Sequence, residues 1–370
     1  MSKRVLIFST AYLPLVGGAE LAVKELTDRL TNFEFELITA KIDPKLPSVE
    51  QVGRVKVYRL GWGSRLDKLI LAFYGGKFGA KLHAKNKYDV TWGVMASFAG
   101  LAAASFKKKT NTPFLLTLQE GDNLNEVESK MAPLWWKFKN IFTSADYVQC
   151  ISNYLAAWAQ KMGVTAPVEV VPNGVDLPVF YCDQEKTCGG DSSTKTIFTA
   201  SRLVKKNAVD VIIEALAILP DYFKLKIAGT GEEEDKLKTL IKKLGLENRV
   251  EFLGNLNKEA VAKELSHADV FTRPSRSEGL GNSFLEAFAA GVPVVATPVG
   301  GIPDFLKDDE TGFLVPVDDS QALAEKIKFI TSSQNKEKVW TIINAARALV
   351  KQTYNWDTLA PRLAQILNQL

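Results

Sequence analysis

Short apolar runs alternate with amphipathic segments along most of this chain, and this alternation restricts its possible folds more than any other feature. The run at 4–10, RVLIFST, is apolar through its middle, as expected for a strand covered on both faces. Residues 19–30 place Ala22, Leu26 and Leu30 on one helical face. Further strand-like runs lie at 33–40, 54–60, 88–94, 113–119, 147–152 and 168–174. Strands that alternate with helices predict a parallel sheet with right-handed crossovers.

A polar stretch interrupts this alternation near the middle of the chain. Residues 176–195 are rich in Gly, Ser and Thr and carry no apolar period, which is typical of a linker or surface loop. The alternation restarts at residue 196. Strands are expected at 196–203, 223–231, 249–254, 268–275, 292–297 and 312–316, and helices at 208–219, 232–245, 320–331 and 356–370.

The length of 370 residues also favours more than one domain, since a single domain usually has roughly 100–200. We therefore predict an α/β fold with two Rossmann-like parallel-sheet domains facing a cleft. The expected parts are a first domain at 1–178, a linker at 179–195, a second domain at 196–352, and a closing helix at 353–370 that packs towards the first domain. Ligands of such sheets bind outside the carboxyl ends of the strands, so the cleft is the expected site.

Composition narrows the classes of function. Hydrophobic residues make up 46 % and charged residues 24 %, as in soluble globular proteins, and the net charge of +4 is well short of a nucleic-acid-binding arm. No apolar run reaches the ~18–20 residues needed to span a bilayer, and the N-terminus lacks the cleavage site of a signal peptide. The sequence thus predicts a cytoplasmic protein. The three cysteines show no metal-ligand spacing and there is no Asp-x-Asp motif, so we expect no metal.

The stretch at 274–301, PSRSEGLGNSFLEAFAAGVPVVATPVGG, holds two glutamates eight positions apart, Glu278 and Glu286. Gly279 and Gly281 would let the backbone approach a ligand without a Cβ in the way. A carboxylate in a glycine turn after a strand has no obvious structural task, which favours a functional role for Glu278.

A helix should begin at Asn282 or Ser283, after this turn. Its free N–H groups would suit a phosphate. Ser283 and Glu286 also fit a capping box, S-x-x-E, and the capping interpretation of Glu286 stays open at this point.

The segment SEGLGNSFLEAFAAGVPVVATPVGGIPD closely resembles the signature of glycosyltransferase family 4, of the glycosyltransferase group 1 type, which are retaining enzymes with the GT-B fold. The resemblance implies that Glu278 lies by the donor sugar and that Glu286 binds the ribose of the nucleotide. It also implies that the intervening backbone contacts the donor sugar and phosphate, at Gly279, Leu280, Gly281, Asn282 and Ser283. The cleft-facing domains would then be an acceptor-side domain followed by a nucleotide-sugar domain.

The segment SRLVKKNAVDVIIEA at 201–215 resembles the phosphate-binding segment of the family. Arg202 is expected to reach the donor diphosphate as a charge-assisted fork. Most relatives have a lysine five residues later, where this chain has Asn207. Either Lys206 substitutes for that lysine, or Asn207 donates a weaker neutral hydrogen bond.

Three shorter segments extend the resemblance. YLPLVGGAE at 12–20 is similar to the N-terminal glycine loop, AGTGEEEDKL at 228–237 has a Gly-x-Gly turn, and FLGNL at 252–256 is similar to the segment that meets the nucleobase. The residues implied in donor binding are Gly17, Gly18, Gly229, Gly231, Leu253 and Asn255. VPNGVD at 171–176 is another family feature, for which we expect a tight turn rather than catalysis.

The N-terminal half departs from the family pattern. Many relatives have a histidine near the donor sugar, where this chain has Gln119 in LLTLQEGDN. Glutamine can bond a sugar hydroxyl but cannot act as acid or base. Glu120 and Asp122 are alternative contacts for the sugar or acceptor, or polar residues of a turn. The two histidines of the chain, His83 and His267, lie elsewhere.

Two segments mix lysines with large apolar residues. These are RLDKLILAFYGGKFGAKLHAKNK at 65–87 and PLWWKFKNIF at 133–142. They favour either ordinary helix packing or peripheral contact with an anionic membrane, at the inner face of the plasma membrane. In the second case the acceptor would be a lipid-linked sugar.

The resulting hypothesis is a retaining, hexosyltransferase-type enzyme that moves a sugar from a nucleoside diphosphate donor to a glycan or glycolipid hydroxyl, with no cofactor. In this hypothesis Glu278, Arg202 and Lys206 carry the catalysis. Two alternatives stay open, namely a nucleotide-sugar epimerase of the same fold and a non-catalytic sugar-nucleotide or glycan-binding protein.

Overall fold

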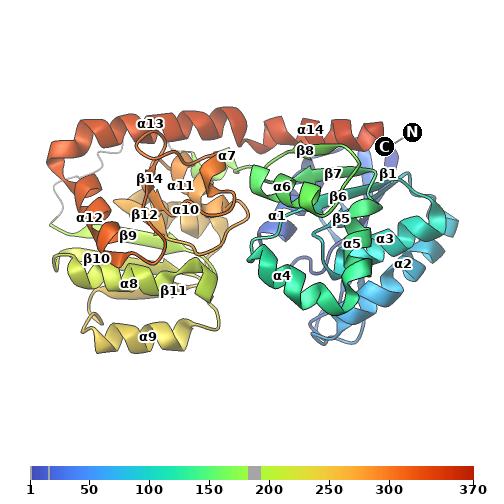
Figure 1. The fold of residues 1–370 in the computed structure, drawn as a ribbon, viewed down its shortest axis with the longest axis horizontal. Helices are drawn as coiled ribbons and strands as arrows, with labels where there is room; N and C mark the ends of the chain where they lie inside the picture. Colours follow the sequence, from blue (N-terminus) through green and yellow to red (C-terminus); the bar gives the residue numbers. More distant parts are fainter. Residues whose placement is uncertain (1, 16, 182–192) are drawn as a thin grey trace. The chain divides into compact units, whose positions relative to one another are not determined.

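The chain folds into two compact α/β units. The computed structural model describes residues 2–15, 17–181 and 193–370. Unit 1 comprises Met1–Asn173 and Trp356–Leu370, and unit 2 comprises Gly174–Asn355. Each unit has one sheet of its own with helices around it (Figure 1). The predicted class, two parallel-sheet α/β domains, is confirmed.

The first crossing between the units lies earlier than the sequence pattern suggests. Unit 1 ends at Asn173 rather than at residue 178, and the short helix α7 (Leu177–Phe180) already belongs to unit 2. Of the linker expected at 179–195, residues 182–192 lie outside the described residues.

The sheet of unit 1 has eight strands in the order β3-β4-β2-β1-β5-β6-β7-β8. They are β1 (Lys3–Phe8), β2 (Phe33–Ala40), β3 (Val49–Val52), β4 (Val55–Leu60), β5 (Val90–Val94), β6 (Phe114–Leu118), β7 (Tyr147–Cys150) and β8 (Val168–Val170). Neighbouring strands are parallel except β3 and β4. Every residue of β5 and β6 is buried, which explains their continuous apolar sequences. The strand order reverses direction between β1 and β5.

The helices of unit 1 cover both faces of this sheet. They are α1 (Gly18–Arg29), α2 (Asp67–Asn86), α3 (Phe98–Thr110), α4 (Leu124–Met131), η1 (Ala132–Leu134), α5 (Trp135–Thr143), α6 (Asn153–Lys161) and α14 (Trp356–Gln369). Helices α2 and α3 pack closely, and glycine at position 76 permits this. A Cβ there would lie only 2.7 Å from the Ser105 side chain. The last helix, α14, packs against α1, and its Leu363 and Ile366 join the apolar core around β1 and β2.

The sheet of unit 2 has six parallel strands in the order β11-β10-β9-β12-β13-β14. They are β9 (Lys195–Ala200), β10 (Phe223–Ala228), β11 (Val250–Gly254), β12 (Val270–Arg273), β13 (Val294–Ala296) and β14 (Phe313–Leu314). From β9 the chain proceeds outward to β10 and β11. It then returns to β12, on the other side of β9, and proceeds outward to β14. The strand order therefore reverses between β9 and β12.

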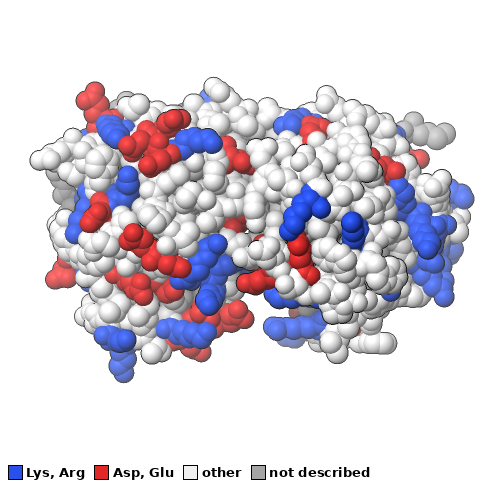
Figure 2. Space-filling view, in the orientation of Figure 1, with Lys and Arg blue, Asp and Glu red and all other residues white. Residues whose placement is uncertain are grey.

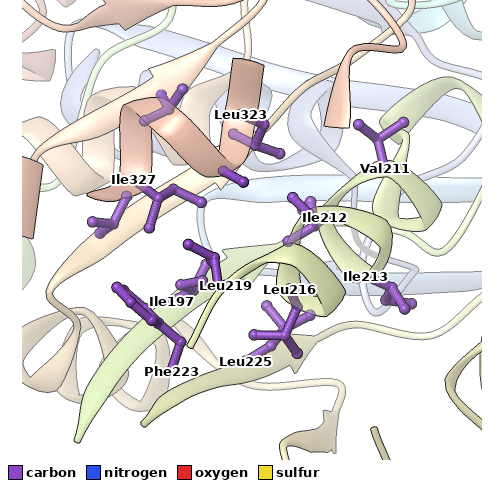
Figure 3. Close-up of a cluster of buried hydrophobic side chains, with 14 of the residues drawn as sticks. Ile197, Val211, Ile212, Ile213, Leu216, Leu219, Phe223, Leu225, Leu323 and Ile327 are labelled. Atoms are coloured by element: carbon purple, nitrogen blue, oxygen red, sulfur yellow. The ribbon is translucent and has the colours of Figure 1, made fainter. Parts of the chain in front are cut away.

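The helices around this sheet build the core of unit 2. Besides α7 they are η2 (Lys205–Asn207), α8 (Val209–Ile218), α9 (Glu234–Lys243), α10 (Lys258–His267), α11 (Asn282–Ala289), η3 (Ile302–Asp304), α12 (Ser320–Thr331), η4 (Ser333–Asn335) and α13 (Lys336–Thr353). Figure 3 shows side chains of α8 and α12 packed over β9 and β10, among them Ile212, Leu216, Leu323 and Ile327. The sequence pattern predicts α8, α9 and α12 to within a few residues, whereas α13 is unpredicted.

Candidate active site

The reversal of strand order in unit 2 creates a site at the carboxyl edge of its sheet. Loops that follow two adjacent strands of opposite winding diverge at such a point and leave a crevice between them. Arg202 lies in the loop after β9, and Glu278 lies in the loop after β12. Helix α11 begins directly after that second loop. Sheet topology thus places three of the sequence-predicted features at neighbouring strand ends.

The carboxylate of Glu278 is held by a buried arginine that ends β12. Nη2 of Arg273 donates to Oε2 of Glu278 over 2.5 Å, and Nη1 donates to Oγ of Ser283 over 2.9 Å. The guanidinium also lies over the Phe284 ring, with Cζ 4.5 Å from the ring centroid. The Arg273 side chain is 8 % exposed and the Glu278 side chain 12 %. With so little water to compete, this charge-assisted pair fixes the direction of the Glu278 carboxylate.

The start of α11 differs from the expected capping box. The N-cap is Gly281, whose φ of 90° is left-handed, and no side chain in the described part of the chain caps this end. Ser283 is the second helical residue, and its hydroxyl accepts from Arg273. The expected cap from Ser283 to Glu286 is therefore wrong, because a capping side chain must precede the first helical residue. An uncapped helix N-terminus suits an anion.

The backbone of Glu278 is held from the segment after β13. The amide of Gly301 donates to the Glu278 carbonyl over 3.2 Å. A Cβ at Gly300, where φ is 57°, would lie 1.7 Å from that carbonyl oxygen. Glycine at position 300 is thus needed to position the Glu278 loop, since side-chain bulk there would displace the loop.

The loop after β9 presents Arg202 to solvent and uses Asn207 internally. The side chain of Arg202 is exposed, whereas Asn207 is buried and its Nδ2 donates to the Arg202 carbonyl over 2.7 Å. Asn207 thereby closes the loop around Arg202, and one of its two amide N–H groups is engaged. Lys206, half-buried in the same loop, supplies the positive charge that Asn207 lacks, and its substitution for the lysine of the family stays a prediction.

A second arginine fastens this loop to the Glu278 loop. The amide of Arg276 donates to the Lys206 carbonyl over 2.7 Å, and its guanidinium donates to the Lys205 carbonyl and to both carboxylate oxygens of Asp210. Asp318 accepts from Nε of the same side chain over 2.6 Å. Arg276 therefore couples the loops after β9 and β12, on which Arg202 and Glu278 lie.

The glycines of the Gly-x-Gly turn serve backbone packing within unit 2. A Cβ at Gly229, where φ is 124°, would lie 1.9 Å from the Ser201 carbonyl oxygen, and one at Gly231 would lie 2.2 Å from that of Leu203. These contacts bring the loop after β10 against the loop that carries Arg202. Asn255 follows β11 beside them, and its Oδ1 accepts from the Thr230 hydroxyl over 3.1 Å. The structure thus assigns both glycines a structural task, and a ligand contact by their backbone stays a prediction.

Leu253 lies in β11, and Leu280 lies in the turn before α11. Leu253 is half-buried, whereas Leu280 is buried. The site residues proposed for the nucleobase and for the sugar therefore come from the two sides of the strand reversal.

Glu286 lies one turn into α11, partly buried and without the capping role. Burial raises its pKa to about 7, and the positive charges of Arg273 and Lys258 lower it in part. The two glutamates of the signature thus have different surroundings, because Glu278 pairs directly with Arg273 and Glu286 does not.

In unit 1 the corresponding strand reversal lies between β1 and β5. Gly17 is the N-cap of α1 in an extended conformation, and Gly18 is its first residue. Gln119 follows β6 and is buried; its Oε1 accepts from Nδ2 of Asn173 over 3.2 Å. Residues 171–174 form no turn, so the turn expected at Asn173 is wrong and this side chain instead anchors Gln119.

Glu120, next to Gln119, is a buried acid with one carboxylate oxygen that lacks a hydrogen-bond partner among the described residues. Its Oε1 accepts from the Ala96 amide over 2.5 Å, whereas Oε2 has no hydrogen-bond partner in the described part of the chain. Burial raises its pKa to about 7. Asp122, by contrast, is exposed. A buried acid with a free oxygen can donate or accept a proton, and it is a functional candidate on this side.

Among the described residues, no three His, Cys, Asp or Glu side chains gather as metal ligands would. Within the same ranges, no helix has the length and apolar character to cross a membrane.

Comparison with protein-family models decides the family. The Glycosyltransferase Family 4 model matches residues 16–178, and the Glycosyl transferases group 1 model matches residues 188–348. The chain belongs to the glycosyltransferases that these two models describe.

Known relatives agree with this assignment. A putative colanic acid biosynthesis glycosyltransferase of Escherichia coli is 31 % identical over 63 % of this glycosyltransferase and 59 % of the relative. Sucrose-phosphate synthase from Thermosynechococcus elongatus has a similar structure, with a TM-score of 0.87 at 24 % identity, over 99 % and 98 % of the two chains. Anabaena HepE in complex with UDP and glucose has a TM-score of 0.81 at 21 % identity over 100 % of both chains. Together they identify the fold as GT-B.

Arg273 and Arg276 are the parts of the glycosyltransferase site that the sequence motifs do not reveal. Arg273 ends the buried strand of VFTRPS, where an apolar residue is expected. A charged residue at the end of an apolar run was the signal in the sequence that could have indicated a functional role. Arg276 carries no such signal, since its partner Asp210 lies 66 positions away.

The raised pKa of Glu286 predicts that the difference in stability between the parent and the variant Glu286→Gln depends on pH. Its ordinary pKa of 4.5 rises to about 7 in the folded glycosyltransferase, so the folded state binds this proton more tightly and loses stability as the pH rises from 4.5 to 7. Glu286→Gln removes the charge. Its free energy of unfolding relative to the parent should therefore increase by about 1–3 kcal/mol between pH 5 and pH 8. Urea unfolding at both pH values measures it, with exposed Glu310→Gln as control; a constant difference would contradict the prediction.

Proposed function

We propose that this glycosyltransferase transfers a hexose from a nucleoside diphosphate sugar to a hydroxyl group of a glycan or glycolipid, with retention of the anomeric configuration. The observation that carries the proposal is the carboxylate of Glu278, fixed by buried Arg273 directly before an uncapped helix N-terminus. A sugar is oriented by fixed hydrogen-bond acceptors, and a diphosphate by an anion site. One short loop supplies both.

The diphosphate would lie at the start of α11, with Arg202 and Lys206 as cations. Arg202 is exposed in the loop after β9, and Arg276 ties that loop to the Glu278 loop. A guanidinium can bind two phosphate oxygens as a fork. These groups would stabilise the charge that develops on the departing diphosphate, which is the main electrostatic task in this reaction.

Glu278 would accept hydrogen bonds from the donor sugar, and Glu286 from the two ribose hydroxyls. The transfer then needs one concerted exchange on one face of the sugar. The oxygen of the acceptor hydroxyl bonds to the anomeric carbon as the bond from that carbon to the diphosphate oxygen breaks. The acceptor's proton passes to the departing diphosphate oxygen, so no side chain needs to act as base. Because both oxygens occupy the same face, the configuration is retained.

The relatives support the choice of substrate class. The HepE structure contains UDP and glucose, which supports a nucleoside diphosphate hexose as donor. The name of the Escherichia coli relative refers to colanic acid biosynthesis, which supports a glycan or lipid-linked acceptor. We propose no metal cofactor, since the cationic side chains and the helix N-terminus can neutralise the diphosphate.

A transfer assay tests the proposal against its two alternatives. The full-length protein is incubated with UDP-, GDP- and ADP-hexoses and with a mixture of lipid-linked and oligosaccharide acceptors, with and without EDTA. Formation of an α-linked product from an α-linked donor, at the same rate in EDTA, is the expected result.

Epimer formation without transfer would instead support a nucleotide-sugar epimerase. That enzyme needs acid and base groups near C2 of the sugar, yet His83 is in α2 and His267 in α10, away from the strand reversal. Donor binding without any product would support a binding protein. Gln119 and Asn207 are the sequence arguments for that hypothesis, and in the structure each side-chain amide makes one internal hydrogen bond.

An exposed patch of unit 1 supports a peripheral membrane contact. Phe73 of α2 is 57 % exposed and Trp136 of α5 is 69 % exposed. Nζ of Lys137 lies 5.1 Å from the centroid of the Phe73 ring and 5.0 Å from that of the Trp136 ring, so the two aromatics and the lysine are adjacent. Figure 2 also shows Lys and Arg side chains gathered over the part of unit 1 that holds α2 and α3. The last turn of α3 carries three lysines, Lys107, Lys108 and Lys109. Exposed aromatics beside lysines suit the interface of an anionic bilayer, on the cytoplasmic face in this proposal.

The double variant Phe73→Ala/Trp136→Ala should lose binding to vesicles. We expect the affinity for vesicles with 30 % phosphatidylglycerol to fall by about tenfold or more, because two aromatic side chains no longer enter the interface. Co-sedimentation at 0.1 M salt measures it. Tyr222→Ala, which removes an exposed aromatic of unit 2, is the control and should bind like the parent. Equal binding of the double variant and the parent would show that the patch does not contact lipid.

A further inference from the structure

Unit 2 contains a buried arginine that lacks the partners a buried charge normally has. Arg347, on α13, is 8 % exposed. In the described ranges its guanidinium has neither a hydrogen bond nor an ion pair, and its buried Nε is without a partner. Burial of a charge without a partner costs several kcal/mol in general, so structures rarely keep one without a use.

A second cation, Lys351, lies near the same aromatic ring as Arg347. Cζ of Arg347 lies 5.4 Å from the centroid of the Tyr181 ring, and Nζ of Lys351 lies 5.3 Å from the same centroid. Arg347 and Lys351 are one helical turn apart on α13. Two like charges at this spacing repel each other, and attraction to one ring offsets that repulsion only in part.

These residues line a pocket of about 240 Å³. It is lined by Tyr181, Asn344, Arg347, Ala348, Lys351 and Gln352, none of which is acidic. Asn344, Arg347 and Lys351 recur at three- and four-residue steps and therefore lie along one face of α13. Arg347 is the buried member, whereas Asn344, Lys351 and Gln352 are exposed and offer further hydrogen-bond donors. The small side chain of Ala348 leaves space between them.

The pocket lies at the opposite end of α11 from the proposed donor site. A Cβ at Gly291, which follows the end of α11, would lie 3.4 Å from Cδ of Arg347. The negative end of the α11 dipole therefore stabilises Arg347 in part. It supplies no hydrogen bond to the guanidinium, so the donors of Arg347 are still available to a ligand.

We propose that this pocket is a second anion site, which binds a phosphate or carboxylate group of a small molecule between Arg347 and Lys351. The guanidinium supplies a fork of donors to two oxygens, and the ammonium and the amides of Asn344 and Gln352 complete the contacts. The site is separate from the transfer reaction and does not depend on the function proposed above.

Calorimetric titration with inorganic phosphate and with citrate tests the proposal in the full-length protein. Arg347→Met should weaken binding by about tenfold or more, since a charge-assisted fork is lost, and exposed Lys351→Met should weaken it by about threefold or more. Lys336→Met removes an exposed lysine at the start of the same helix and is the matched control. Arg202→Met separates this pocket from the proposed donor site, where phosphate would also bind.

Binding that persists in Arg202→Met and Lys336→Met and is lost in Arg347→Met supports the proposal. A preference for phosphate or for citrate identifies the type of anion. In anion-free buffer Arg347→Met should melt at or above the temperature of the parent, because it removes an unpaired buried charge. Binding that is unchanged in both Arg347→Met and Lys351→Met, or no binding of either anion to the parent, would overturn the proposal.

Discussion

Replacing Glu278 with glutamine should lower the turnover number of sugar transfer by about 10²–10³-fold and leave the Kd for the nucleoside diphosphate within about threefold. The variant keeps one acceptor oxygen but loses the charge that pairs with Arg273 over 2.5 Å. In the proposed reaction this carboxylate faces the sugar, where positive charge develops in the transition state. Its loss therefore affects turnover more than binding of the leaving group. Initial rates at saturating donor, with calorimetry of the nucleoside diphosphate, measure both quantities.

Two further variants separate a role in the reaction from a role in folding. Arg273→Met leaves Glu278 in place but removes its partner, and it should also lower turnover; Arg273→Lys should recover part of the loss. Glu310→Gln removes an exposed charge away from the strand reversal and should behave as the parent. If Glu278→Gln were to transfer sugar at the parent rate, the assignment of this glutamate to the donor sugar would be wrong.

The double variant Arg202→Met/Lys206→Met should lose both transfer and donor affinity. We expect turnover to fall by about 10²–10³-fold and the Kd for the nucleoside diphosphate to rise by about tenfold or more, because the two cations would stabilise the diphosphate before and during its departure. Each single variant should show a smaller loss. Steady-state kinetics across donor concentration separates the two effects.

Lys205 provides a matched control for this experiment. It is exposed and adjacent to Lys206, so Lys205→Met changes the same charge in the same loop. Its carbonyl, which accepts from Arg276, is unaffected by the substitution. Equal losses in Lys205→Met and Lys206→Met would mean that general charge rather than a specific contact is involved. The single Lys206 and Asn207 variants then decide which of the two replaces the lysine of the relatives.

The architecture was largely predictable because it depends on repeating local patterns. Continuous apolar runs such as 4–10 and 113–119 predicted buried parallel strands, and β1 and β6 lie there. Helix α13 was the main omission, although Val339, Ile343, Ala346 and Val350 form an apolar face along it. The antiparallel edge strand β3 was also missed, since its four residues alternate in burial and are too short to give a clear pattern.

The site was predictable only in its motif residues. Their surroundings contradicted simple local rules in two places. The spacing of Ser283 and Glu286 fits a capping box, but Arg273 binds the Ser283 hydroxyl, and the N-cap position is held by Gly281, which has no side chain to cap the helix. Asn173 is followed by glycine as in a tight turn, yet it reaches Gln119, 54 positions away. In both cases a hydrogen bond made in the folded unit replaces the interaction that the local pattern predicts.

By itself the sequence determined the two α/β units and the glycosyltransferase signature, because apolar periods and a contiguous motif are local properties of a chain. Only the tertiary structure decided how that signature is held. The Arg276–Asp210 pair joins loops from two strands whose adjacency depends on strand order, and the buried Arg273 acquires its meaning from Glu278, Ser283 and Phe284 around it. The same holds for Arg347 and Tyr181, whose contact no spacing in the sequence could indicate. The energy of a buried charge depends on which groups surround it in space, and that information exists only after folding.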